Sequence, residues 1–423
     1  MKKYIIIGWC AGVGGGQIYT RNKCVVVRKL GYEPIVIHCS LRKTVILDLV
    51  GFDKNRAREI RFIPSFYSRR ERERILNKLV EIVNPQENDE FFIESNDAVY
   101  SFWGELLAKR LGCKNYSFLL EYFFSRKNDD IEYFKFKAKR HELAGIMKES
   151  LPSLFGNDYK LLDEENTVLS AFSTNSVEDI PIPFELDTSK YDVVVGNIGR
   201  ITKPYVQWMS KDLCEFANEH KDKSILLLLV GGEPGTSEET RIKETLKPCR
   251  NVDVFSTGFL FPMPQKLLEK IHVATATSGC IITALKVNLV TVGYRDDDYY
   301  PSGVCGYDLK LFPPPDIPLD KRRKLGDYLN EVLYGDFLSR YQLTSYLDDG
   351  DHSARWLQLE EQTQQMLHPC EPLYYDTTKI LPRSVFKKYY IKSIGHILPI
   401  HFIMEFVEKT GIMVRYHEFM DKH

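Results

Sequence analysis

The stretch YIIIGWCAGVGGGQIYTRNKCVVVRKLGYEPIVIH, residues 4–38, decides the fold class of this 423-residue chain. It opens with apolar residues typical of a short buried strand and continues through a glycine-rich loop at 8–16. Apolar residues at helical spacing follow from Ile18 to Leu30, Gly31 ends the helix, and residues 34–38 form the next strand. This order predicts a βαβ unit with parallel strands.

The same alternation continues along most of the chain, with a proline-containing stretch at 179–190 that indicates a linker. The further predicted elements are a helix at 71–83, a strand at 91–93, a helix at 100–111, a strand at 116–120, a strand at 193–196, a helix at 205–219, strands at 225–230, 252–256, 273–276 and 289–292, and a short helix at 283–287. Beyond 351 the pattern is mostly helical, and 385–416 mixes aromatic, aliphatic and basic residues, as in a packed helix or a membrane-contacting surface element. We therefore expect domains at 1–185 and 186–350 and a helical extension at 351–423.

Composition excludes several classes of protein. The net charge is −1, with 43% hydrophobic and 27% charged residues, which is typical of a soluble globular protein and argues against a nucleic-acid partner. The longest apolar run, 225–230, is far shorter than the ~20 residues of a membrane-spanning helix. The nine cysteines are scattered without a C-x-x-C pair, which favours a reduced, cytoplasmic chain.

Three loops between a strand and a helix could bind phosphate groups. The first contains Gly12 and Gly14–Gly16, where free N–H groups and the positive end of a helix would meet an anion. Its spacing departs from G-x-G-x-x-G, and His38-Cys39-Ser40 after the next strand lacks the acidic residue of a nicotinamide-dinucleotide site. The alternative is a tight turn without a ligand.

The other two loops lie in the second half of the chain. Arg200 and Lys203 follow the strand at 193 and could neutralise a departing diphosphate, the alternative being a solvated surface. Ser278 and Gly279 open a helix at a second place suited to an anion, the alternative being an ordinary N-cap.

No metal site is predicted. Asp296-Asp297-Asp298 contains a D-x-D pattern and Asp348, Asp349 and Asp351 form an acidic turn, but both fit solvated loops better than metal sites. The ten histidines show no metal-ligand spacing.

Taken in order, the glycine loop, the linker, the Gly199-Arg200…Lys203 loop, Gly231-Gly232-Glu233, Thr257-Gly258-Phe259 and Ser278-Gly279 resemble a known family. The chain resembles the GT-B-fold glycosyltransferases, specifically the retaining family-4 (glycosyltransferases group 1) enzymes, over roughly residues 1–310. The resemblance implies an α/β protein of two Rossmann-like βαβ domains facing across a cleft. The N-terminal domain would bind the acceptor and the C-terminal domain a nucleoside-diphosphate sugar.

The resemblance also implies roles for individual residues. Arg200 and Lys203 would be catalytic residues that bind the diphosphate. Glu121, the third implied catalytic residue, would lie on the acceptor side, at a position where the family more often has histidine. The remaining implied contacts are, for the donor, Gly15, Gly16, Phe259, Thr275, Ser278, Gly279 and Thr283 and, on the acceptor side, Glu94 and Asn96. Thr275 and Thr283 stand where the family usually has two glutamates.

The implied function is metal-independent glycosyl transfer without a cofactor, from a nucleotide sugar to a glycan or lipid-linked acceptor in surface polysaccharide biosynthesis. Two alternatives remain open. One is a catalytically silent GT-B protein that acts as a partner or scaffold in a polysaccharide assembly complex, which the two missing glutamates would fit. The other is a GT-B nucleotide-sugar epimerase.

The small net charge conceals an asymmetry. Residues 1–80 hold 17 Lys+Arg against 6 Asp+Glu, a net charge of +11, which leaves −12 for the remaining 343 residues. A basic acceptor domain suggests peripheral contact of a cytoplasmic protein with the anionic inner face of the plasma membrane. The alternative is a solvated surface balanced by acidic patches elsewhere.

Overall fold

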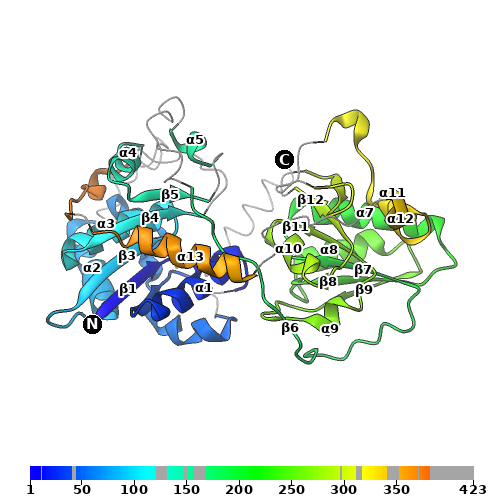
Figure 1. Cartoon of the computed structure of the whole chain (residues 1–423), viewed down its shortest axis with the longest axis horizontal. Helices are drawn as coiled ribbons and strands as arrows, with labels where there is room; N and C mark the ends of the chain where they lie inside the picture. Colours follow the sequence, from blue (N-terminus) through cyan, green and yellow to red (C-terminus); the bar gives the residue numbers. More distant parts are fainter. Residues whose placement is uncertain are drawn as a thin grey trace. The chain divides into compact units, whose positions relative to one another are not determined.

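The computed structural model describes residues 1–10, 12–40, 44–120, 131–146, 150–155, 168–295, 298–310, 317–340, 352–369 and 371–381. The chain divides into two compact units (Figure 1). The first unit comprises Met1–Gly12, Tyr19–Phe172 and Trp356–His423, and the second comprises Val13–Ile18 and Ser173–Arg355.

The first unit is built on a parallel sheet with the strand order β2-β1-β3-β4-β5. Its strands are β1 (Lys2–Ile7), β2 (Glu33–Ile37), β3 (Glu90–Ser95), β4 (Lys114–Leu119) and β5 (Leu143–Gly145). Its elements outside the sheet are α1 (Gly15–Lys29), whose first turn lies in the second unit, η1 (Leu47–Asn55), η2 (Arg58–Arg61), η3 (Pro64–Phe66), α2 (Arg69–Val83), α3 (Ala98–Leu111), α4 (Ile131–Lys139), α5 (Ser150–Phe155), α13 (His352–Met366) and η7 (Thr377–Lys379). Ile5 pairs with both Ile35 and Ile93, so the centre of this sheet is apolar and fully enclosed.

Local signals in the sequence explain where these helices begin and end. Ser68 caps α2 in a capping box with Glu71, whose side chain accepts a hydrogen bond from the Ser68 backbone N–H. Asp97 caps α3, and Gly112, with a φ of 68°, ends it in the left-handed conformation that glycine adopts at little cost.

The described part of the segment after residue 351, which contains α13 and η7, packs against elements of the first unit. The stretch at 385–416 lies outside the described residues. Lys23 in α1 donates hydrogen bonds to Thr363 Oγ1 (2.9 Å) and Met366 Sδ (3.4 Å) in α13. Further along, Thr377 Oγ1 donates to the carbonyl of Phe102 (2.9 Å). Figure 1 shows α13, in orange, near α1, to which these hydrogen bonds join it.

The second unit contains a six-stranded sheet with the order β13-β12-β11-β7-β8-β9, in which only β13 is antiparallel to its neighbour. Its strands are β7 (Val193–Ile198), β8 (Ile225–Val230), β9 (Val252–Ser256), β11 (Val273–Thr277), β12 (Thr291–Tyr294) and β13 (Pro301–Val304), with β6 (Val177–Glu178) and β10 (Met263–Pro264) paired separately. Its remaining helices are α7 (Pro204–Glu219), α8 (Ser237–Leu246), α9 (Gln265–Leu268), α10 (Gly279–Leu285), η5 (Leu319–Lys321), α11 (Leu325–Leu333) and α12 (Phe337–Arg340).

This sheet is covered on both faces, because successive residues of its strands belong to two different cores. In β7, Val193 and Val195 pack with Met209 of α7, whereas Val194 packs with Leu267 of α9. The near-continuous apolar strand at 225–230 is therefore buried on both sides, as expected for a parallel sheet.

The α/β fold class predicted from the sequence is confirmed: both units are doubly wound, Rossmann-like βαβ arrangements, the architecture expected of a GT-B protein. The expectation of a fully reduced chain is wrong, because Cys214 of α7 and Cys249 form a disulfide. The two lie 35 residues apart, so no local cysteine motif reveals the pair. Within the described residues, no helix is both long and apolar enough to span a bilayer.

Candidate functional site

The candidate site lies at the carboxyl edge of the second sheet, where the strand order reverses. From β7 the sheet extends through β8 and β9 on one side and through β11 and β12 on the other. The connections that leave β7 and β11 therefore turn to opposite faces of the sheet, and ligands of such folds bind in the crevice that this divergence creates. These two connections carry the predicted motifs at 199–203 and 277–279.

One hydrogen bond spans this switch point. Lys203 Nζ donates to Thr277 Oγ1 at 2.7 Å, joining the loop after β7 to the last residue of β11. Lys203 is also the N-cap residue of α7, and Pro204 fills the first helical position, where no backbone N–H is needed. Arg200, three residues earlier in the same loop, is exposed. The structure thus brings together the cationic loop and the Thr277-Ser278-Gly279 turn.

Glycines let the neighbouring loops approach one another closely. Gly231 has a φ of 97°, and a Cβ added there would lie 2.9 Å from the carbonyl oxygen of Gly199. The Gly258 N–H donates to the Gly232 carbonyl at 2.8 Å, which ties the loop after β9 to the loop after β8. Phe259, the predicted nucleobase contact, follows Gly258 in this loop and is half-buried.

Ser278 turns the chain from β11 into α10 in a conformation that an L-residue rarely adopts. Its φ is 49° and its ψ is −134°, and its side chain does not cap the helix. Such a backbone conformation costs on the order of 1–3 kcal/mol and is concentrated at functional sites. The sequence predicted Ser278 as an anion-binding or capping residue, and the strain is a feature that the sequence alone does not reveal.

The end of the glycine loop, residues 13–16, belongs to the second unit and lies next to this turn. Gly15 and Gly16 begin α1, and a Cβ on Gly15 would be 3.5 Å from the Ser173 side chain. A Cβ on Gly279 would be 3.7 Å from the Ser173 carbonyl oxygen. Ser173 therefore lies between the first residues of α1 and α10, Gly15 and Gly279, neither of which has a side chain. No motif in the sequence singled out Ser173.

The two threonines at the family's glutamate positions are engaged inside the domain. Thr275 is fully buried, and its Oγ1 lies 3.3 Å from Asn197 Oδ1. Thr283 is 2% exposed and donates to the carbonyl of Gly279 at 3.0 Å. Because both hydroxyls bond within the fold, we leave Thr275 and Thr283 out of the proposed site.

Asn197 is a residue that the sequence reading missed. It is fully buried near the carboxyl end of β7, and its Oδ1 accepts a hydrogen bond from Tyr205 Oη at 2.8 Å. Its Nδ2 has no hydrogen-bond partner among the described residues. A buried amide without a partner is costly, and its position two residues before Gly199 makes it a candidate polar group of the site. The signal was present, because an asparagine interrupts the otherwise apolar strand VVVGNI.

The first sheet has its own switch point between β1 and β3, where Gly8 and Asn96 follow the two strands. Asn96 is 1% exposed, and neither atom of its side-chain amide has a partner among the described residues. A Cβ on Gly8 would lie 3.1 Å from Asn96 Nδ2. Asn96, predicted on the acceptor side, is therefore a buried polar group at an edge suited to a ligand.

Glu94, also predicted on the acceptor side, is held within the core. Its carboxylate accepts hydrogen bonds from Tyr4 Oη (2.6 Å) and Tyr19 Oη (2.8 Å) and forms an ion pair with Lys23 (3.3 Å). Burial, reinforced by Glu94, raises the pKa of both tyrosines far above the usual value, so they remain hydrogen-bond donors. These contacts give Glu94 a structural role. Glu121, the remaining predicted catalytic residue, lies outside the described residues.

Among the described residues, no group of three or more His, Cys, Asp or Glu side chains is placed to bind a metal ion. Asp298 instead pairs with Arg322 at 3.2 Å. The other two residues of the D-x-D stretch, and the acidic turn at 348–351, are outside the described residues.

No family model and no curated protein sequence matches this chain. Solved structures similar to it include HepE of Anabaena in complex with UDP and glucose, at 12% identity and a TM-score of 0.47, covering 69% of this chain and 80% of HepE. The lipopolysaccharide outer core galactosyltransferase WaaB is also 12% identical, with a TM-score of 0.48 and coverage of 87% and 99%. The UDP-GlcNAc 2-epimerase of Neisseria meningitidis bound to UDP-GlcNAc is 12% identical, with a TM-score of 0.39 and coverage of 71% and 84%.

Proposed function

We propose that this protein is a metal-independent GT-B glycosyltransferase that binds a nucleoside-diphosphate sugar at the switch point of its second sheet. The observation that carries the proposal is the Lys203–Thr277 hydrogen bond, which fixes an ammonium group between the carboxyl ends of β7 and β11. Arg200 in the same loop supplies a second cation whose planar fork suits phosphate oxygens.

The chemistry that these groups support is departure of a diphosphate. As the bond between C1 of the sugar and the diphosphate oxygen breaks, its electron pair stays on that oxygen. The acceptor hydroxyl oxygen bonds to C1, and the hydroxyl proton passes to an oxygen of the departing diphosphate. Arg200 and Lys203 stabilise the growing negative charge, and in such sites this electrostatic term is usually the largest single contribution. We assign the sugar acceptor, a glycan or a lipid-linked saccharide, to the edge of the first sheet at Asn96, whose buried amide can exchange hydrogen bonds with a hydroxyl group.

The first test is nucleotide binding. We expect UDP, GDP or ADP to raise the melting temperature of the protein, and Arg200→Ala to weaken the affinity for that nucleotide by about tenfold or more, because a charge-assisted hydrogen bond contributes roughly 1.5–3 kcal/mol. Arg241→Ala is the matched control, since Arg241 is an exposed arginine of α8 and does not belong to the loops after β7 and β11. An unchanged affinity in Arg200→Ala would remove the diphosphate role of this residue.

A catalytically silent GT-B protein is the second candidate, and the burial of Thr275 and Thr283 favours it. Two measurements on nucleotide sugars, with and without membrane extract, separate the candidates: the release of free nucleoside diphosphate and the identity of the nucleotide sugar that remains. A transferase should release the diphosphate in an acceptor-dependent way. A silent protein should bind without turnover, and an epimerase should convert the nucleotide sugar without any acceptor.

We further propose that the first unit contacts an anionic membrane where a lipid-linked acceptor is presented. Residues 1–80 carry a net charge of +11, and within them Leu47 is 83% exposed, with Val45 and Val50 also exposed. An apolar tip within a basic segment can insert while the surrounding cations bind lipid headgroups.

Co-sedimentation with vesicles tests this contact. We expect binding to phosphatidylglycerol vesicles that falls with salt, and a loss of about tenfold in Leu47→Asp, because burying a leucine side chain contributes roughly 1.5–3 kcal/mol. Leu357→Asp is the control, since Leu357 is 58% exposed on α13 of the same unit. Equal losses in both variants, or none, would contradict the proposed contact.

A further inference from the structure

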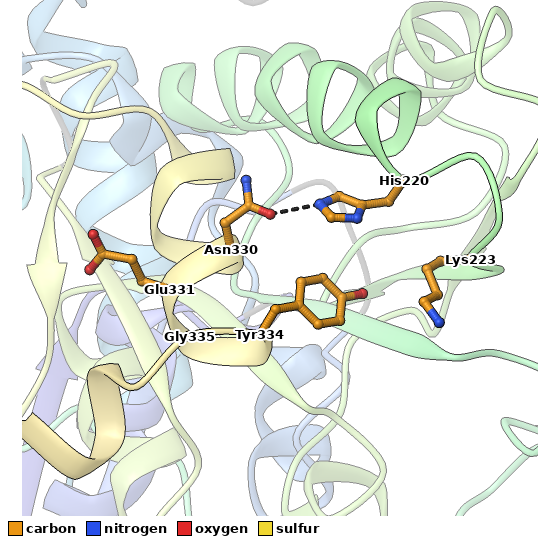
Figure 2. A pocket seen from close by; sticks show the side chains of 6 residues that line it. All are labelled: His220, Lys223, Asn330, Glu331, Tyr334 and Gly335. Atoms are coloured by element: carbon orange, nitrogen blue, oxygen red, sulfur yellow. Dashed lines mark hydrogen bonds between the residues drawn. The ribbon is translucent and has the colours of Figure 1, made fainter.

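The second unit has a pocket at the end of α7 opposite to Lys203. Its volume is about 500 Å³, within the usual range for small-molecule sites. The residues that line it are His220, Lys223, Asn330, Glu331, Tyr334 and Gly335 (Figure 2). Because α7 has 16 residues and rises about 1.5 Å per residue, the pocket lies roughly 24 Å from the Lys203 loop. It is therefore separate from the switch-point site.

Two of the residues that line the pocket, His220 and Tyr334, have aromatic rings. His220 Nε2 lies 2.6 Å from Asn330 Oδ1, which fixes the imidazole between the end of α7 and α11. The Tyr334 ring lies 4.9 Å from the His220 ring, and the Phe216 ring packs against the imidazole at 4.6 Å. Tyr334 is nevertheless 47% exposed, so a broad aromatic surface held by its neighbours faces solvent.

The charges around the pocket are largely paired. Glu331 bonds to Arg323 (2.8 Å) and Arg340 (3.2 Å), and Figure 2 shows its carboxylate directed away from the Tyr334 hydroxyl. Lys223 lies 3.6 Å from Asp222. Strongly charged ligands such as nucleotides would therefore gain little electrostatic binding energy in this pocket, and a neutral ligand suits it better.

The polar groups that remain at the pocket suit hydroxyl groups. With a proton on Nε2 shared with Asn330, His220 keeps Nδ1 as an acceptor. Figure 2 shows the Tyr334 hydroxyl pointing towards Lys223, so a phenol and an ammonium group lie on one side of the aromatic surface. A Cβ on Gly335 would lie 2.8 Å from the Glu331 carbonyl oxygen, so this part of the lining has no room for a side chain.

We propose that this pocket is a second carbohydrate-binding site, which holds a neutral hexopyranose unit of an oligosaccharide away from the reaction site. The apolar C–H face of the sugar packs on the Tyr334 ring, and its hydroxyls bond to His220 Nδ1, Tyr334 Oη and Lys223 Nζ. Aromatic residues with one apolar face and one polar end suit such amphipathic ligands. The site needs neither the donor nucleotide nor catalytic turnover.

Saturation-transfer NMR and calorimetric titration of the full chain with maltose, cellobiose and N,N′-diacetylchitobiose test the proposal. We expect at least one of the three to bind equally well with and without saturating UDP. Tyr334→Leu should weaken binding about tenfold, since the aromatic surface is lost. Tyr299→Leu is the control, because Tyr299 is equally exposed, at 47%, in the same unit. Absence of binding by all three, or an equal loss in both variants, overturns the proposal.

A second pair of variants tests the polar side of the pocket without touching the aromatic rings. Lys223→Gln should weaken the same sugar about threefold to tenfold, as expected for one lost hydrogen bond, while Lys221→Gln, an exposed lysine two residues away, should leave it unchanged. Nucleotide affinity should be unaltered in all four variants, which keeps this result independent of the donor site. If the sugar affinity is unchanged in both single variants, Lys223→Gln and Tyr334→Leu, the sugar binds outside this pocket and the proposal is wrong.

Discussion

At Gly231 the backbone φ is 97°, and an added Cβ would lie 2.9 Å from a backbone oxygen, which cannot swing aside as a side chain would. We expect Gly231→Ala to lower the free energy of unfolding by roughly 1–3 kcal/mol and to weaken nucleotide binding, because the loops after β7 and β8 must separate. Chemical denaturation and titration with the nucleotide measure both effects.

Gly235 supplies the control for this change. It also has a positive φ, 77°, but no atom lies within 4 Å of a Cβ built there. Gly235→Ala therefore places an alanine at a positive φ, which costs stability, but its Cβ meets no neighbouring atom. The affinity for the nucleotide should be retained. If Gly231→Ala and Gly235→Ala lose nucleotide affinity to the same extent, the close approach of the loops after β7 and β8 is not needed for nucleotide binding.

Lys286 gives a prediction about pH. Burial, with a smaller contribution from Arg355, lowers the pKa of its ammonium group from 10.5 to about 8. The unfolded chain therefore binds more protons at this position than the folded one between these two pH values, and stability rises with pH across that window. We expect the free energy of unfolding of the natural protein to rise from pH 8 to 10 relative to Lys286→Met. Parallel pH profiles for the two proteins would contradict the shifted pKa.

Loops of unusual composition are what let the sequence predict single residues of the candidate site. Arg200, Lys203, Ser278 and the glycines were predicted in this way, and their roles stay predictions. Whether Thr275 faces a ligand or the interior could not be read from the sequence, because its hydroxyl bonds to Asn197, a residue 78 positions earlier in the chain.

Among the elements, the turn between β11 and α10 stores strain at Ser278, whose φ is 49° and ψ is −134°. Ser278→Gly should raise the free energy of unfolding by about 1 kcal/mol, because relief of this strain exceeds the entropy cost of glycine. Ser278→Ala should not raise it, since alanine keeps the strain and loses only the hydroxyl. Thermal denaturation of both variants distinguishes the two contributions, and equal stabilities would show that the turn is unstrained.

The periodicity of apolar residues predicted most strands of both sheets and the helices α1, α2, α3, α7 and α10, because each element buries one face or stripe locally. It did not predict α4, β5, α8 or α11. Which strands become neighbours was not visible. β7 and β11 pair although 79 residues separate Gly196 from Thr275, and this pairing is what creates the switch point. Likewise, nothing in the local sequence shows that α13 packs on α1.

For the whole molecule, the two units should unfold as separate calorimetric transitions. Lys23→Met leaves the buried Glu94 carboxylate without its cation and should lower the transition of the first unit, at a cost of about 3–5 kcal/mol, while the other transition stays in place. Lys29→Met is the control, because Lys29 pairs with Glu360 at the surface and such pairs contribute about 0–1 kcal/mol. A shift of both transitions in Lys23→Met would show that the units unfold together.

The position of α13 also has a consequence for the growing polypeptide on the ribosome. All residues of the second unit have been translated once Arg355 is added, whereas the first unit still lacks Thr363 and Met366, which bond to the buried Lys23 ammonium. Domains generally fold as units during synthesis. We therefore expect chains truncated after residue 355 and released from the ribosome to hold a protease-resistant second half and a protease-sensitive N-terminal half. The half of this protein that leaves the ribosome first would be the last to reach its final structure.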